Sequence, residues 1–237
     1  MQIIPVIDIR GGIVVHARGG NRDAYSALNS VLTRSTDVFQ VVNDILNWYP
    51  FEQFYIADLD AIEAAKHRPE FYAELVQCFT GTQFWLDAGI TSQKDLRLYS
   101  KLHNLKIVIG SETLKSSSLL EIEGARQSMI LSLDRRGKQL LGDHNLLHRT
   151  ELWTEKTIVM DLDVVGANQG PSLEWLQALI AQRPDIEWYA AGGVRNKADL
   201  EQLQKIRAAG TLVASALHTG QIDKAELQKI EQVHRPF

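Results

Sequence analysis

The stretch AGITSQKDL (residues 88–96) returns later in the chain as GGVRNKADL (residues 192–200), and this repeat bears directly on the fold. A second motif, DLD, stands at 58–60 and again at 161–163. The two motifs keep the same order and are offset by 104 and 103 residues. Because two separate motifs share nearly one offset, we predict two similar halves, each built from the same structural units.

Eight short runs, rich in apolar and β-branched residues, are spread along the chain and predict strands. Stretches with helical spacing lie between most of them, such as 92–102, where Leu96, Tyr99 and Leu102 follow Ser92 as a helix N-cap. Strands that alternate with helices form parallel βαβ units, and eight such units predict an α/β fold, the (β/α)8 TIM barrel, here with a two-fold half-barrel repeat. The predicted strands are 3–8, 53–60, 83–89, 105–111, 128–134, 156–163, 186–193 and 211–217.

The length of 237 residues suits one such barrel, and no linker-like composition separates the halves. We therefore predict a single domain over residues 1–237. The alternative is an open, doubly wound sheet, which usually carries a glycine-rich dinucleotide turn after its first strand. The sequence IDIRGG, which closes the first run, lacks the G-x-G-x-x-G pattern, so the barrel is favoured.

The bulk composition excludes several classes of protein. A net charge of −4 and a pI near 6.0 give no basic surface for nucleic acid. One cysteine, Cys78, allows no disulfide within the chain, and no apolar run approaches the length of a membrane span. The first residues do not resemble a signal peptide, so we expect a cytoplasmic protein. His144 and His148 lack a third ligand at metal spacing, and we predict neither metal nor cofactor.

Carboxylates close several of the predicted strands, where the active site of a (β/α)8 enzyme lies. Asp8 and Asp134 close the first and fifth runs, which would be diametrically opposed, and they could act as a general acid and base. Asp161 and Asp163 close the sixth run and would face one way if the strand continued through them. The alternative for each aspartate is that it only caps the following turn or helix.

Glycines and serines at other strand ends predict anion sites. Gly192 and Gly193 precede a helix, and Ser215 closes the last run, which together predict a phosphate site between the seventh and eighth strands. A plain turn is the alternative. The matching place in the first half contains Ser111, but Asp87 and Glu112 stand nearby and oppose an anion. That end could take a weaker anion, a cation or amine, or a differently placed phosphate.

The loop 16–28 is polar and follows the first predicted strand. It contains Arg18, Arg22 and Tyr25, and it could fold over the mouth of the barrel as a substrate lid. An ordinary surface loop is an equally good interpretation. We include Arg22 among the candidate substrate-binding residues.

The ordered motifs IPVIDIRGG, ADLDA, IGSET, SLDRRGK, AGGVRNKADL and ASALHTG together resemble the barrel family of histidine biosynthesis. This family includes ProFAR isomerase and the cyclase subunit of imidazole glycerol phosphate synthase. The resemblance covers essentially the whole chain. It implies a (β/α)8 barrel made of two half-barrels and a substrate related to a phosphorylated aminosugar, without a metal or cofactor.

The resemblance also implies roles for individual residues. Asp8 matches the acid/base aspartate of the first strand, and Asp134 matches an important aspartate of the fifth. The candidate binding residues are Gly192, Gly193, Ala214 and Ser215 for one phosphate, Gly89, Gly110 and Ser111 for the other, and Asp161 at the sixth strand.

Three positions depart from the isomerase pattern. Met160 stands where the isomerase has a catalytic threonine, and Val165 stands where it has its general acid. The third strand ends in Asp87-Ala88-Gly89-Ile90 rather than G-G-G-I. Valine cannot transfer a proton, so Asp163, two residues before it, is the candidate replacement acid.

Two functions follow from these matches and departures. The first is an isomerase of the Amadori type, which converts an aldose to a ketose, or a lyase-like enzyme, acting on a phosphorylated aminosugar or ribotide-like molecule. The second is a non-catalytic barrel that binds a phosphorylated metabolite, for which related proteins imply a place in one-carbon cofactor (methanopterin-type) metabolism. The sequence does not identify a protein partner.

Overall fold

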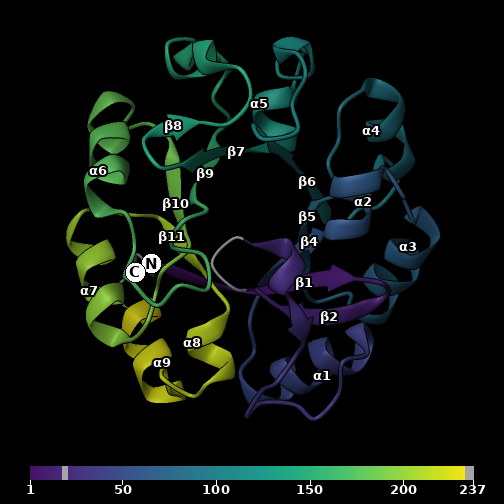
Figure 1. Cartoon of the computed structure of the whole chain (residues 1–237), viewed down its shortest axis with the longest axis vertical. Coiled ribbons are helices and arrows are strands. Elements are labelled where there is room, and N and C mark those ends of the chain that lie inside the picture. Colours follow the sequence, from purple (N-terminus) through teal and green to yellow (C-terminus); the bar gives the residue numbers. More distant parts are fainter. Residues whose placement is uncertain (18–20, 233–237) are drawn as a thin grey trace.

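The computed structural model describes residues 1–17 and 21–232. Within them, eight parallel strands form a closed barrel and helices lie around it (Figure 1). Parallel pairing of β1 with β11, from Gln2↔Gly210 to Pro5↔Val213, closes the barrel and confirms the predicted (β/α)8 fold. The barrel strands are β1 (Gln2–Arg10), β4 (Gln53–Asp58), β5 (Gln83–Asp87), β6 (Leu105–Gly110), β7 (Met129–Arg136), β9 (Lys156–Asp161), β10 (Glu187–Ala191) and β11 (Gly210–Val213).

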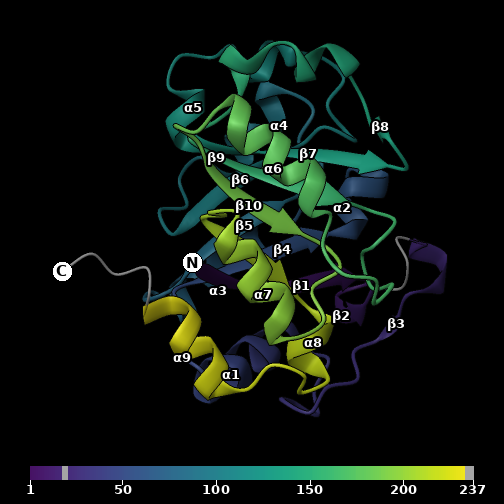
Figure 2. The same ribbon diagram turned by 90° about the vertical axis from the view of Figure 1, so that its left-hand side faces the viewer.

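Three short antiparallel strands extend the barrel sheet. The strands β2 (Ile13–His16) and β3 (Ser26–Ala27) follow β1, and β8 (Gln139–Leu140) folds back on β7. The helices are α1 (Val38–Trp48), α2 (Leu59–Ala64), α3 (Pro69–Cys78), α4 (Gln93–Tyr99), α5 (Ala125–Ser128), α6 (Leu173–Gln182), α7 (Lys197–Lys205), α8 (Ser215–His218) and α9 (Lys224–Gln232). Figure 2 shows α6 and α7 on the outside of the strands β9 and β10.

Side chains alternate between two apolar layers along each barrel strand. In β5, Trp85 points into the barrel, whereas Phe84 and Leu86 pack between the barrel and the helices. Trp85 meets Tyr189 of β10 inside the barrel, edge to face, with ring centroids 4.8 Å apart. The barrel is therefore a packed core below its mouth, and a substrate can enter only at one end.

The repeated motif makes the same local structure twice. Ser92 caps α4 as predicted, and its hydroxyl accepts a hydrogen bond from the backbone of Asp95. The Asp95 carboxylate accepts from the backbone N–H of Thr91 at 3.2 Å, and Asp199, 104 residues later, accepts from that of Arg195 at 2.8 Å. The equivalent bonds agree with a half-barrel repeat, which stays a prediction.

Among the residues that the structure describes, none of the helices is both long enough and apolar enough to cross a bilayer.

Candidate active site

The carboxyl ends of the barrel strands surround a cavity of about 650 Å³. Its wall contains side chains from strands on all sides of the barrel and from the loops that follow them. This is the end at which the sequence predicted the site.

Asp8 and Asp134 face this cavity from opposite walls. In the strand order of the closed barrel, three strands separate β1 from β7 in each direction. Removal from water raises the pKa of Asp8 to about 7, although the nearby Arg22 guanidinium acts against this. Burial likewise raises the pKa of Asp134 to about 7, although the Ser132 hydroxyl, which donates to Oδ1 at 2.5 Å, favours its ionised form. Each group can therefore hold or release a proton near neutral pH.

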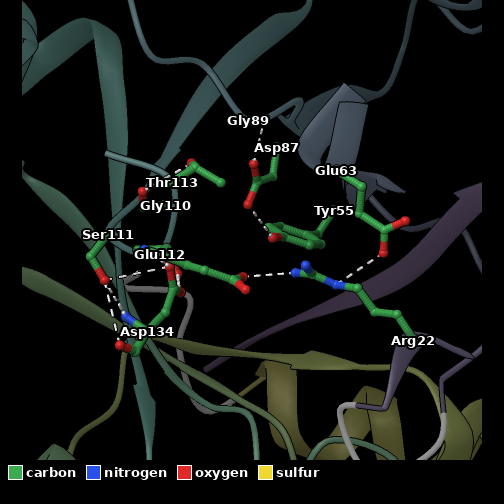
Figure 3. Close-up of polar contacts among 11 residues, drawn as sticks. Arg22, Tyr55, Glu63, Asp87, Gly89, Gly110, Ser111, Glu112, Thr113 and Asp134 are labelled. Carbon is green, nitrogen blue, oxygen red and sulfur yellow. Dashed lines mark hydrogen bonds and ion pairs between the residues drawn. The ribbon is translucent and has the colours of Figure 1, made fainter. Parts of the chain in front are cut away.

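Asp87 and Tyr55 lie on the same wall as Asp8, because the strand register places Asp8, Ala57 and Asp87 side by side across β1, β4 and β5. Burial raises the pKa of Asp87 to about 6, partly offset by the hydrogen bond from the Gly89 backbone. The Tyr55 hydroxyl donates to Asp87 Oδ2 at 3.3 Å (Figure 3). Burial and the surrounding carboxylates raise the pKa of Tyr55, so it stays a protonated donor. Tyr55 lies within the predicted strand 53–60 and was not among the predicted site residues.

Arg22 lines the cavity as predicted, but its charge is engaged. Its guanidinium lies between two carboxylates, with Nη2 2.7 Å from Glu112 Oε2 and Nε 3.9 Å from Glu63 Oε1 (Figure 3). Tyr25 also lines the cavity, and burial, together with Asp8, raises its pKa to about 12. The loop thus reaches the mouth of the barrel, and its action as a lid stays a prediction. Arg18 lies outside the described residues.

The predicted phosphate residues Gly192, Gly193, Ala214 and Ser215 all line the cavity. Gly192 and Gly193 have φ angles of +96° and +82°, and a Cβ on Gly193 would lie 2.1 Å from the carbonyl oxygen of Gly170. Only glycine fits there, so the backbone itself forms this part of the wall.

His16 also belongs to this end of the cavity, although it was not among the predicted site residues. Its Nε2 lies 3.1 Å from the Ser215 hydroxyl, although 199 residues separate them in the chain. Behind them, burial lowers the pKa of His218 to about 4, so that ring is neutral. No local sequence pattern predicts the turn that places His16 next to Ser215.

The other predicted phosphate residues have a different setting. Gly89, Gly110 and Ser111 are not among the described residues that line the cavity. Ser111 is buried, and its Oγ accepts a hydrogen bond from the Asp134 backbone at 2.8 Å. Asp87 and Glu112 line the cavity instead.

Asp161 and Asp163 are turned away from the cavity. Asp161 is buried and forms an ion pair with Arg135, whose Nη2 lies 2.7 Å away. Asp163 is exposed, and its Oδ2 accepts from the Gly137 backbone. The strand ends at Asp161, so alternation stops there, and Leu162 and Val165 line the cavity instead. The structure does not bring Asp163 to Asp8 and Asp134.

Among residues 1–17 and 21–232, no three His, Cys, Asp or Glu side chains are grouped so that they could hold a metal ion.

Comparisons with known proteins agree with this architecture. A family model described as "Histidine biosynthesis protein" matches residues 2–223. An uncharacterized protein of Methanocaldococcus jannaschii is 29% identical over 231 residues, which cover 96% of this chain and 97% of the relative. Two imidazole-4-carboxamide isomerases, whose names specify two phosphoribosyl groups, are also similar. That of Lactiplantibacillus plantarum is 28% identical and that of Streptococcus sanguinis 23%, each over 98% of this chain and at least 99% of the relative.

Proposed function

Because this chain belongs to the histidine biosynthesis protein family, we propose that it is an isomerase-like barrel enzyme acting on a phosphorylated aminosugar. The reaction is an Amadori-type rearrangement of an aldose to a ketose, or a lyase-type reaction through the same intermediate. The observation that carries this proposal is the pair of opposed carboxyls, Asp8 and Asp134, which face one cavity and have pKa values of about 7. Isomerases of this family support the reaction type.

Proton transfers account for the whole rearrangement. Asp134, protonated, gives its proton to the ring oxygen as the C1–O bond breaks, and the nitrogen lone pair forms a C1=N bond. Asp8, ionised, removes the proton at C2, and its bonding electrons form C1=C2 while the C=N electrons return to nitrogen. The enol then takes a proton at C1 and loses one from its oxygen, which leaves a C2 ketone with no net gain or loss of atoms.

Near neutral pH, two carboxyls with similar pKa values can act as general acid and general base. Two acids with pKa values of about 7 are each partly ionised there. A fraction of the molecules therefore has Asp134 protonated and Asp8 ionised, which supplies one acid and one base. The Tyr55 hydroxyl stays protonated, and it can donate to the developing enolate oxygen if its proton leaves Asp87, to which it donates at 3.3 Å.

The phosphate of the substrate would lie at the Gly192–Gly193 end. The glycine backbone there permits close approach, and the Ser215 hydroxyl and the His16 ring supply polar partners. A phosphate held at this end would place the sugar carbons between Asp8 and Asp134.

The test is turnover of a panel of phosphorylated aldosylamines, followed by mass spectrometry. Asp8→Asn and Asp134→Asn should each lower kcat/KM at least about a hundredfold, because each removes a proton-transfer group. Asp185→Asn is the matched control, since this exposed aspartate precedes β10 at the closed end of the barrel. Unchanged turnover in either active-site variant would contradict the proposal.

A non-catalytic phosphate-binding barrel is the second candidate, and one observation favours it. The apolar side chains of Val165 and Met160 line the cavity where the resemblance implies a general acid and a threonine. This alternative predicts that phosphate esters raise the melting temperature but never yield a product. It also predicts failure to restore growth of a histidine auxotroph, a failure that we expect of both candidates.

A further inference from the structure

The geometry points to a substrate that carries a single phosphate and, at its other end, an amine rather than a second phosphate. This inference rests on the proposed function and names the substrate class of the same site. The residues that decide it are Asp87 and Glu112, which line the cavity on the wall opposite the Gly192–Gly193 end. The isomerases that resemble this chain are named for substrates with two phosphoribosyl groups.

Backbone donors on this wall are already occupied by carboxylates of the chain. The N–H of Gly89 donates to Asp87 Oδ1 at 3.0 Å, and the N–H of Glu112 donates to Asp134 Oδ2 at 3.1 Å (Figure 3). A phosphate binds to backbone N–H groups at such strand ends. Here its oxygens would have to displace a carboxylate from each donor and then remain beside that carboxylate.

The charge balance of the wall opposes a second phosphate as well. Arg22 faces Glu112 at 2.7 Å and Glu63 at 3.9 Å, and Glu63 also pairs with Arg10 at 3.1 Å. Three acids, Asp87, Glu63 and Glu112, thus stand beside the two guanidinium groups of Arg10 and Arg22. A phosphate dianion would meet net negative charge, whereas an ammonium group would be attracted to it.

Asp8 adds a further carboxyl to the lining of the cavity. Its side chain is partly exposed there, so it can accept hydrogen bonds from a bound ligand. An amine brings two or three N–H donors, while a phosphate brings only acceptors. The opposite end of the cavity differs, because its lining includes the glycine backbone, Ser215 and His16.

Three matched compounds separate these alternatives by isothermal titration at pH 7. Glucosamine 6-phosphate and glucose 6-phosphate differ only in an amine, and glucose 1,6-bisphosphate adds a second phosphate. The wild-type protein should bind the amine compound about tenfold more tightly than glucose 6-phosphate, and the bisphosphate about tenfold more weakly. Equal or tighter binding of the bisphosphate would overturn the inference.

Two substitutions test Asp87 directly. Asp87→Ala removes the charge and frees the N–H of Gly89, so it should bring the affinity for the bisphosphate up to that for glucose 6-phosphate. Asp87→Asn keeps the shape of the side chain and serves as the test if the alanine variant fails to fold. It should give a smaller gain in affinity for the bisphosphate. Both substitutions should reduce the preference for the amine compound. Asp185→Ala, at the closed end of the barrel, should change neither this preference nor the affinity for the bisphosphate. Unchanged selectivity in a folded Asp87 variant would overturn the role of this residue.

The outcomes also separate this inference from the proposed function. If no phosphate compound binds, the proposed function itself fails and the inference fails with it. If the compounds bind and an aminosugar phosphate is turned over, but bisphosphates bind equally well, only the inference is wrong.

Discussion

The carboxyls of Asp8 and Asp134 determine how activity should vary with pH. The base must be ionised and the acid protonated, and both pKa values are about 7. We therefore expect a bell-shaped profile of kcat/KM with its maximum near pH 7 and a tenfold fall per pH unit on each side. A profile that is flat from pH 5 to 9 would contradict an acid and a base with these pKa values.

Substitution of Asp87 should shift the basic limb of this pH profile. Its negative charge helps to raise the pKa of Asp134, the proposed acid. In Asp87→Asn the pKa of Asp134 should fall, so activity at high pH should be lost earlier, which the basic limb of kcat/KM reports. The acidic limb, which reports ionisation of Asp8, should move less. An unmoved basic limb would show that Asp134 is not the acid.

Asp87 should also make stability depend on pH. Burial raises its pKa in the folded protein to about 6, above the unfolded value near 4. Below pH 4 Asp87 is protonated in both the folded and the unfolded state, so it does not lower the free energy of unfolding. Above pH 6 the folded state must hold a disfavoured charge, which lowers that free energy. The melting temperature of Asp87→Asn relative to wild type should therefore be higher at pH 8 than at pH 4. An equal difference at both pH values would contradict this account.

The sequence predicted some of these residues and not others, for reasons that can be stated. Asp8 and Asp134 were found because they close strands whose positions in a barrel are fixed by their order. Asp163 was expected beside Asp161 on one face, but β9 ends at Asp161, and the turn sends the later carboxyl away from the cavity. His16 meets Ser215 only through the closure of the barrel, and no local pattern records that contact.

At the scale of elements, the end of β10 should tolerate no side chain at Gly193. Gly193 and Gly124 have similar φ angles, +82° and +77°, so alanine suffers similar backbone strain at each, of about 1–2 kcal/mol. A Cβ on Gly193 would meet the carbonyl of Gly170, whereas a Cβ on Gly124 would meet nothing within 4 Å. Gly193→Ala should therefore lower the free energy of unfolding more than Gly124→Ala, as urea denaturation measures.

The same comparison tests the phosphate end. Gly193→Ala should weaken binding of glucose 6-phosphate, because the wall of the cavity must move, and Gly124→Ala should leave it unchanged. Equal effects of the two substitutions on both stability and binding would show that the contact with Gly170 is unimportant.

The elements themselves were largely predictable from the sequence. All eight barrel strands lie within a few residues of their predicted ranges, because each is a short apolar run bounded by turn residues. The antiparallel strands β2, β3 and β8 were not predicted. They are two to four residues long and depend on pairing with β1 and β7, which periodicity within so short a segment cannot indicate.

At the scale of the whole molecule, closure of the barrel joins the two ends of the chain. β1 pairs with β11 on one side and with β4 on the other, so both predicted halves contribute to one continuous sheet. We therefore expect the predicted single domain to unfold in one cooperative transition, in which the calorimetric and van't Hoff enthalpies agree. A bound phosphate ester should raise the temperature of that whole transition. Two separate transitions would indicate halves that fold independently.

The central claim is that Asp8 removes the C2 proton of a phosphorylated aminosugar. The most direct measurement is NMR spectroscopy of the product formed in D₂O from a converted aldosylamine phosphate. The account predicts a ketose with one solvent-derived deuterium at C1, formed by the wild-type protein and Asp185→Asn but not by Asp8→Asn. A ketose without deuterium at C1, or the same deuterated product from Asp8→Asn at an unchanged rate, would contradict it.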